Sequence, residues 1–585
     1  MKNFQDLWRQ RFQSILEGLY SPLGQTLGQD QVVAEIPPKP EMGDLAFPMF
    51  SYAKVLRLAP PLLAKQLVQA LSPFSAEAEI FALGPYVNLR YSRSGITGSV
   101  VDRVMAEGDG WGRTRALAGD RVMVEFSSPN TNKPLHIGHL RNNTLGEAMS
   151  RILAANGAEV HKVNLINDRG VHICKSMLAY QKFGEGKTPG SEGIKPDRFV
   201  GEYYVKFAQW AETEPTAEAQ AQEMLLSWEA GDHDVRALWK TMNAWAIEGV
   251  SQTYARQGIT FDRLYKESET YLLGKEEVLK GLAKEVFRRR DDGAIVVDLP
   301  WKDRAEDETN AVKVMLRPDG TSIYITQALG TAIRRHADWP FNQLVYVVAN
   351  EQDFHFKVLF YVLKALGYGW AENLFHLSYG MVKLPDGSRI KSRSGTTADG
   401  DDILDDLRDG ALEEIRAKGR EGEVDDAEKT AELIALGALH YFLLQATPSK
   451  DMIFDPKETL SFNGNTGPYL QYMGARISSM LAKAPAVDGE WDPCLLSSQD
   501  EWELVKLLSR FPEAVEESGR SKDPSVVAGF AYDLAKTYSK FYHDSPVLTA
   551  EDPRLVAGRL RLSRAVLQVL MNSFRLMNIP FLRAM

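Results

Sequence analysis

Hydrophobic and polar positions divide the chain into three parts with different patterns. In residues 1–110, apolar side chains recur at roughly helical spacing at Phe4, Leu7, Phe12, Ile15 and Leu16. A proline-rich break follows at 37–40, and residues 81–89 are typical of a turn followed by a strand. The first part is therefore expected to be a small α+β domain.

The second part, residues 111–405, has an α/β pattern. Short β-rich or apolar runs at 121–128 and 344–349 are followed by helical patterns. The second run is continuously apolar, as in a strand that a parallel sheet buries on both faces. This alternation predicts a Rossmann-like, doubly wound sheet. Residues 176–262 are helical and rich in tryptophan, which predicts an insertion in this domain.

The third part, residues 406–585, shows no strand pattern and is expected to be an all-α domain. Its end is rich in arginine, at Arg554, Arg559, Arg561, Arg564, Arg575 and Arg583. These side chains form either a solvated helix face or a stripe that contacts phosphates.

Composition narrows the class of protein. Hydrophobic residues make up 44% and charged residues 25% of the 585 positions, which is ordinary for a globular chain. Two cysteines, Cys174 and Cys494, are too few for a disulfide framework or a cysteine-built zinc site, and they favour a reducing, cytoplasmic compartment. The net charge of −10 argues against wholesale wrapping by nucleic acid but allows a local basic face. No signal peptide or membrane-spanning stretch is expected.

The sharpest chemical signal is a His-x-Gly-His pattern at residues 136–139. It follows a predicted strand and opens a predicted helix, where backbone N–H groups and the helix dipole favour anions. Helical spacing places His136 and His139 on one face, where both rings can donate to charge that develops at a phosphorus under in-line attack. Gly138 lets a flat base approach closely. The alternatives are core histidines or a metal site, and no third metal ligand is suggested by spacing.

Residues 125–142, which contain this pattern, resemble the signature of class I aminoacyl-tRNA synthetases, and among them the arginyl-tRNA synthetase family. Further segments resemble that family's N-terminal tRNA-contacting domain, first crossover and helical anticodon-binding domain: 39–44 and 84–88, 167–170, and 465–472 with 583–585. The resemblance implies two steps, in which arginine and ATP give arginyl-adenylate and the adenylate then esterifies tRNA(Arg). It implies Mg²⁺ on the ATP phosphates, and a tRNA requirement for the first step. We expect a monomer.

The resemblance also assigns the nucleotide-binding residues. His136, His139 and Lys133 are the expected catalytic residues, with Lys133 contacting the ATP phosphates. Residues 385–396 occupy the place of the family's Lys-Met-Ser-Lys-Ser loop, with Ser392 where the second lysine usually falls. ATP binding is expected at Gly138, Arg389, Lys391 and Arg393.

For the amino acid, the resemblance places Glu125, Asn130, Tyr324 and Gln352 in the pocket. A buried Glu125 carboxylate would need a cationic partner, which the substrate guanidinium could supply. The family normally has an aspartate where this chain has Ala328. Glu351 or Asp353 compensates for its loss, or arginine binds weakly; losing a carboxylate opposite a guanidinium costs on the order of 2–5 kcal/mol.

Tyr469, Tyr472 and Arg476 share one helical face and are expected to contact tRNA. Aromatic and arginine side chains can stack on unpaired bases, although two tyrosines can equally pack into a core.

Three other functions remain open from the sequence. The chain could be a different nucleotidyl-transferring enzyme with a His-x-Gly-His helix, although such enzymes need no long helical C-terminal domain. It could be a synthetase-like binding protein that has lost catalysis. It could also be a synthetase for glutamine, glutamate or cysteine.

Overall fold

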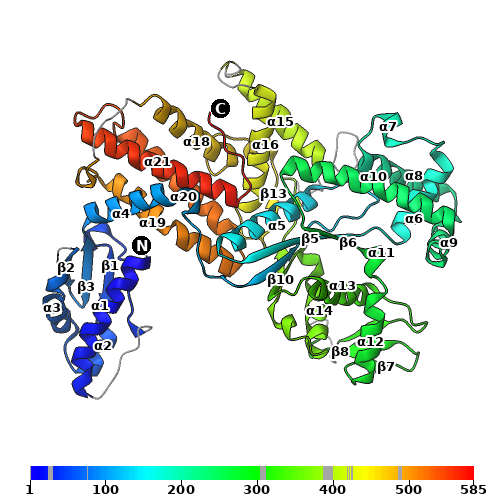
Figure 1. Ribbon diagram of the computed structural model, residues 1–585, viewed down its shortest axis with the longest axis horizontal. Helices are drawn as coiled ribbons and strands as arrows, with labels where there is room; N and C mark the ends of the chain where they lie inside the picture. The colour runs from blue at the N-terminus through cyan, green and yellow to red at the C-terminus, as the bar shows by residue number, and fades with distance from the viewer. Residues whose placement is uncertain are drawn as a thin grey trace.

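The computed structural model describes residues 2–23, 31–75, 77–302, 311–385, 399–417, 419, 422, 426–484 and 491–585. Figure 1 shows a small N-terminal unit, a central sheet with helices, a helical projection and a group of C-terminal helices. The fold expected from the sequence is confirmed in outline. Among the described residues, no helix is long and apolar enough to cross a membrane.

The N-terminal unit is a three-stranded antiparallel sheet of order β1-β3-β2, flanked by helices. Its elements are α1 (Lys2–Tyr20), β1 (Leu45–Pro48), α2 (Phe50–Leu56), α3 (Pro60–Ala70), β2 (Ala78–Leu83) and β3 (Tyr86–Tyr91). The buried face of α1 consists of Trp8, Phe12 and Leu16, which lie four residues apart. Leu7 lies off this face and is 37% exposed. The helix expected there is correct, but Leu7 is not part of its core face.

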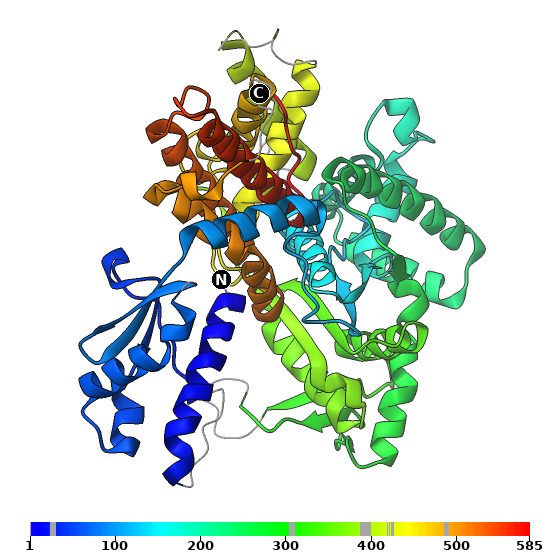
Figure 2. The ribbon, with the colours of Figure 1, turned by 60° about the vertical axis from the view of Figure 1, so that its left-hand side comes forward.

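Helix α4 (Arg93–Glu107) leads from this unit onto the C-terminal helices (Figure 2). Beyond its end, the Trp111 indole donates to the Leu508 carbonyl at 3.0 Å, and the Asn572 amide donates to the Gly108 carbonyl at 2.9 Å. The two ends of the chain therefore pack on one another.

The central sheet has five parallel strands in the order β11-β10-β4-β5-β6. These strands are β4 (Arg121–Glu125), β5 (Glu159–Ile166), β6 (Arg263–Lys266), β10 (Gln343–Ala349) and β11 (Leu374–Tyr379). Three helices lie among them: α5 (Ile137–Ala155), α13 (Tyr324–Asp338) and α14 (Asp353–Ala365). Strand β10 is an interior strand between β11 and β4 and is buried at its apolar positions 344–347, as its sequence predicts.

The helical insertion lies between β5 and β6. It consists of α6 (Val171–Phe183), α7 (Pro189–Glu192), α8 (Pro196–Thr213), α9 (Ala217–Ala230) and α10 (His233–Gln257). After β6 come α11 (Glu267–Thr270), α12 (Leu273–Ala283) and an antiparallel sheet that the sequence pattern did not reveal, with strands β7 (Arg288–Arg289), β8 (Ile295–Asp298) and β9 (Val312–Leu316).

The C-terminal part is helical. Its helices are α15 (Gly400–Ala417), α16 (Ala427–Leu444), α17 (Pro456–Thr459), α18 (Gly467–Ala482), α19 (Gln499–Ser521), α20 (Ser525–Asp544) and α21 (Pro553–Leu576). One expectation fails, because β13 (Met452–Ile453) pairs in parallel with β12 (Val382–Lys383). A two-residue strand is too short to leave a periodic pattern in the sequence.

The arginines near the C-terminus are largely paired within the chain. Buried Arg559 donates to Glu501 at 2.8 Å, and Arg561 donates to Asp102 at 2.7 Å. Arg575 pairs with Asp109 and Arg554 with Asp552. These pairs favour the structural interpretation of the arginine-rich end over a continuous phosphate-binding stripe.

Buried Arg141 ties α5 to two distant segments. Its guanidinium donates to the carbonyls of Gly380 and Met381 at 2.5 and 3.4 Å, and to those of Pro448 and Lys450 at 2.9 and 2.8 Å. Burial lowers the pKa of Arg141 to about 10, so the side chain stays cationic at neutral pH.

We predict that Arg141→Ala destabilises the fold by at least about 3 kcal/mol, because several buried carbonyls lose their donor at once. Urea unfolding followed by circular dichroism measures this loss. The matched change is Arg103→Ala on α4, which removes an exposed pair with Glu107 and should cost less than about 1 kcal/mol. Equal losses for the two variants would contradict the role given to Arg141.

Candidate active site

The turn between β4 and α5 presents the two histidines at the carboxyl edge of the sheet. His136 caps α5: its Nδ1 accepts from the Gly138 N–H at 3.1 Å, and the His139 Nδ1 accepts from the His136 N–H at 3.2 Å. The ring centroids are 4.0 Å apart. Because both Nδ1 atoms accept hydrogen bonds, each neutral ring carries its proton on Nε2.

Burial sets the charge at this turn. It lowers the pKa of His139 well below its usual value, and the neighbouring His136 and Lys133 lower it further. Burial also lowers the pKa of Lys133. His139 is therefore a neutral donor at pH 7. At Gly138, a Cβ would lie 3.0 Å from the His136 ring, so glycine also lets the capping ring sit against the helix.

Of the segment 385–396, which is expected to bind the ATP phosphates, the structure describes only the first residue. Arg389, Lys391 and Arg393 lie outside the described residues. The chain after the loop lies beside the histidine turn, since Asp399 forms an antiparallel bridge with His136 and the Gly400 N–H donates to the Leu135 carbonyl at 2.6 Å.

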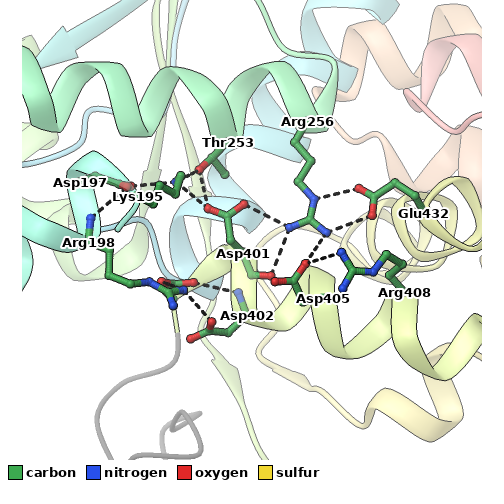
Figure 3. Close-up of polar contacts among 11 residues, drawn as sticks. Lys195, Asp197, Arg198, Thr253, Arg256, Asp401, Asp402, Asp405, Arg408 and Glu432 are labelled. Carbon is green, nitrogen blue, oxygen red and sulfur yellow. Dashed lines mark hydrogen bonds and ion pairs between the residues drawn. The ribbon is translucent and has the colours of Figure 1, made fainter. Parts of the chain in front are cut away.

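A network of charged side chains holds this junction in place (Figure 3). Arg198 on α8 binds both Asp399 and Asp402. Lys195 binds Asp401 at 2.6 Å. The remaining members are Asp197, Thr253, Arg256, Asp405, Arg408 and Glu432. The network joins the insertion helices α8 and α10 to α15 and α16, so it fixes the start of α15 against the histidine turn.

Glu125, at the end of β4, is buried at 5% exposed and pairs with Arg335 of α13, which is 1% exposed. The Ser128 hydroxyl donates to its other oxygen at 3.3 Å. The cationic partner that a buried Glu125 needs is thus Arg335 of the chain itself, whereas the sequence suggested the substrate guanidinium. Burial of Glu125 therefore does not require a guanidinium ligand, because helix α13 brings Arg335 to the carboxylate.

The other predicted pocket residues also lie at the carboxyl edge of the sheet. Asn130 is exposed and bridges to Asn167 after β5, and half-buried Gln352 ends the short turn after β10. Tyr324 begins α13 and its ring is 59% exposed. Desolvation of its hydroxyl by surrounding protein atoms raises the pKa of Tyr324 to about 12. The negative charges of Glu125 and Glu267 raise this pKa further.

Known proteins resemble this chain over its whole length. Residues 101–456 match the family model for the catalytic domain of class I tRNA synthetases (R), 6–91 that for the arginyl tRNA synthetase N terminal domain, and 470–585 that for the DALR anticodon binding domain. The chain is 52% identical to the arginine--tRNA ligases of Treponema denticola and Treponema pallidum, covering 100% of each chain in both comparisons. The chain belongs to the arginyl-tRNA synthetase family. The Thermus thermophilus arginyl-tRNA synthetase structure is similar with a TM-score of 0.78 and 26% identity, covering 99% of this chain and 100% of that one.

In this member of the arginyl-tRNA synthetase family, Ala328 lies on α13 at the position where the family resemblance leads us to expect an aspartate. Ala328 is half-buried and packs on the apolar cluster around α13. Neither neighbour named from the sequence is a buried carboxylate, since Glu351 and Asp353 are both exposed. Asp353 also accepts from the Ser378 hydroxyl at 2.7 Å and lies 3.3 Å from His376.

The predicted tRNA residues of this arginyl-tRNA synthetase family member lie together on α18. Tyr469 and Tyr472 are half-buried and pack against apolar clusters, with the Tyr469 ring 6.0 Å from that of Tyr532. The Arg476 guanidinium lies 4.5 Å from the centre of the Tyr542 ring. Packing therefore accounts for part of each side chain.

Two buried arginines beside the site were not predicted from the sequence: Arg141 and Arg335. Their local patterns are those of ordinary charged helix residues. Arg141 lies within the segment 125–142, but nothing in the sequence marks it as buried. The only sequence signal for Arg335 is a charged residue within the largely apolar pattern of α13.

We predict that breaking the Glu125–Arg335 pair from either side, by Glu125→Gln or Arg335→Met, destabilises the protein by about 3–5 kcal/mol, because each change leaves a buried charge. The double variant should recover much of this loss. Urea unfolding measures all three, with exposed Arg334→Met as the matched control on the same helix. Additive losses in the double variant would show that the two groups do not act as a pair.

Proposed function

We propose that the chain attaches L-arginine to tRNA(Arg) in two steps. A carboxylate oxygen of arginine attacks the α-phosphate of ATP, which forms arginyl-adenylate and releases pyrophosphate. A ribose hydroxyl of the terminal tRNA adenosine then attacks the adenylate carbonyl, which forms the ester and releases AMP. The observation that carries this proposal is the paired-histidine turn at the sheet edge, in a chain whose full length matches arginine--tRNA ligases.

In the first step the histidine turn acts by position and charge. His136 and His139 direct their Nε2 protons to the phosphate oxygens, where negative charge grows during in-line displacement. Lys133 places a cation on the same phosphates, and Gly138 admits the adenine. Arg389, Lys391 and Arg393 stabilise the pyrophosphate as it leaves. No protein nucleophile is needed, so catalysis is by orientation and electrostatics.

The arginine pocket consists of Glu125, Asn130, Tyr324 and Gln352. Glu125 and the Tyr324 hydroxyl accept from the guanidinium, and the two amides hold the backbone end of the amino acid near the histidine turn. Glu125 and Asn130 at the carboxyl end of β4, and Gln352 after β10, share one edge of the sheet, which supports this arrangement.

Magnesium serves this reaction by neutralising phosphate charge. Among the described residues, no group of three or more histidine, cysteine, aspartate or glutamate side chains could hold a metal ion. We propose that Mg²⁺ would enter as its complex with ATP and would be held through the phosphates that Lys133 is proposed to contact.

For tRNA, we propose that residues 1–110 and 406–585 form the two binding domains on either side of the catalytic domain at 111–405. Tyr469, Tyr472 and Arg476 on α18 contact the anticodon bases. We propose further that the enzyme acts as a monomer in the cytoplasm, where Cys174 and Cys494 stay reduced; both are free in the structure.

The direct test is arginine-dependent exchange of pyrophosphate into ATP, with and without tRNA(Arg). We expect exchange with arginine that needs tRNA, and none with glutamine or glutamate. Absence of exchange with arginine in both conditions, while tRNA still binds in a filter assay, would instead support a catalytically silent tRNA binder.

A substitution at His136 separates capping from catalysis. Asparagine is a good N-cap, so His136→Asn should keep the melting temperature near that of the wild type. The exchange rate should fall by about 10²- to 10³-fold, because the Nε2 donor is lost. His136→Ala should lose the cap as well, at about 1 kcal/mol. Full activity in His136→Asn would show that the ring serves only as a cap.

A further inference from the structure

The chain leaves strand β4 through a turn of unusual backbone conformation. Ser127 and Ser128, which together form this serine turn, have φ angles of 74° and 48°, in the left-handed region that favours glycine. The segment that follows leads to Lys133 and His136. A non-glycine residue keeps such a conformation only where the surrounding structure fixes it, and such residues cluster at functional sites.

Three side chains from distant parts of the chain hold the serine turn. The Ser127 N–H donates to the amide oxygen of Asn142 on α5 at 2.5 Å, and the Ser128 N–H donates to that of Asn164 on β5 at 3.0 Å. The hydroxyl oxygens of Ser127 and of Tyr254 on α10 are 2.6 Å apart. Ser127 and its two partners are buried, which strengthens these hydrogen bonds.

The Tyr254 hydroxyl serves two partners at once. It accepts from the amide nitrogen of Asn164 at 3.1 Å, which leaves its own proton for the Ser127 Oγ. Asn164 in turn accepts from Ser128, so one chain of hydrogen bonds joins α10 to both residues of the serine turn. Burial raises the pKa of Tyr254, so the hydroxyl keeps its proton at neutral pH.

Packing alone does not fix the segment after the serine turn. A cavity of about 370 Å³ lies against residues 129–131, and its other walls are mostly apolar side chains of α10, of β5 and of the chain that leads into β6. Tyr254 lines the same cavity. Because side chains do not fill this space, the direction of the segment depends on the serine turn and on the backbone hydrogen bonds between Asn167 and residues 129–131.

The end of α10, which carries Tyr254, is itself anchored by polar contacts (Figure 3). Thr253 donates to Asp401 of α15 at 2.8 Å, and Arg256 pairs with Glu432 of α16 at 2.8 Å. These contacts lie on either side of Tyr254 in the sequence. They hold α10 against α15 and α16, so the Tyr254 hydroxyl offers the serine turn a fixed support.

We propose that Tyr254 is a positioning residue for adenylate formation, whose hydroxyl holds the serine turn and so directs the segment with Lys133 and His136 toward the ATP phosphates. The inference rests on the proposed function. Tyr254 contacts neither substrate and acts through Ser127. A displacement of about 1 Å in a reacting geometry can cost about 10²-fold in rate, so a loosened turn lowers the rate more than it weakens substrate binding.

The test compares Tyr254→Phe with Tyr538→Phe. Tyr538 on α20 is also buried and donates to the Ser563 hydroxyl at 3.0 Å, so both changes break a buried tyrosine–serine hydrogen bond. Arginine-dependent exchange of pyrophosphate into ATP is measured at saturating tRNA(Arg), together with thermal unfolding. Tyr254→Phe should lower kcat by about 10- to 100-fold, with the KM values for ATP and arginine changed by less than about threefold. Tyr538→Phe should keep the wild-type kcat despite a similar loss of melting temperature.

Ser127→Ala removes the other partner of the same hydrogen bond. It should lower kcat by a factor similar to that of Tyr254→Phe. The double variant should be no slower than the slower single variant, because the two changes remove one shared interaction. Losses that multiply in the double variant would show that the two hydroxyls act independently, which would overturn the inference.

An unchanged kcat in Tyr254→Phe, with or without a change in KM, would also overturn it, as would equal losses of kcat in the two phenylalanine variants. If Tyr254→Phe fails to fold, Ser127→Ala decides: a loss of kcat at unchanged KM supports the proposal, and a wild-type kcat overturns it. Failure of the wild-type chain to exchange with arginine would instead overturn the proposed function, so the two failures are distinct.

Discussion

The hydrogen bonds of Arg141 are the constraint on which the rest of the active site depends. Helix α5 carries the histidine turn at its start and Arg141 one turn further along. The guanidinium reaches carbonyls that are 239 and 307 residues away in the chain, before the second loop and after α16. Carbonyls satisfy a buried guanidinium only while all the segments stay in place. One side chain therefore fixes the histidine helix relative to two other parts of the chain.

The network in Figure 3 holds the opposite side of the same turn. Arg198 and Lys195 join the insertion to the start of α15, and Asp399 bridges to His136. Unlike the carbonyl cluster around Arg141, this network is partly open to solvent and consists of formal charges. Its contribution should weaken as salt screens it, whereas hydrogen bonds in the dry interior should not. The turn is thus held by two attachments of different physical character.

The ion pair between Glu125 and Arg335 changes what the burial of Glu125 implies about a ligand. Glu125 needs a cation in order to be buried, and the sequence offers the substrate as the obvious source. Arg335 fills that need from helix α13 and holds the Glu125 carboxylate in one orientation. A cationic substrate would then need further hydrogen-bond acceptors that are not already paired within the protein.

The sequence by itself determined the features that depend on neighbours along the chain. The buried strand β10, the helical insertion and the histidine turn after β4 all follow from local periodicity and residue type, because hydrogen bonding and burial there repeat over a few residues. The two-residue strands β7 and β13 were missed because they are too short for a period, and β8 and β9 were not predicted from the sequence either. The tertiary structure alone decided that Arg335 pairs with Glu125 and that Arg141 meets four carbonyls. The sequence indicates that a buried charged group needs a partner. The partner comes from a strand or helix far away in the chain, and only tertiary packing brings the two groups together.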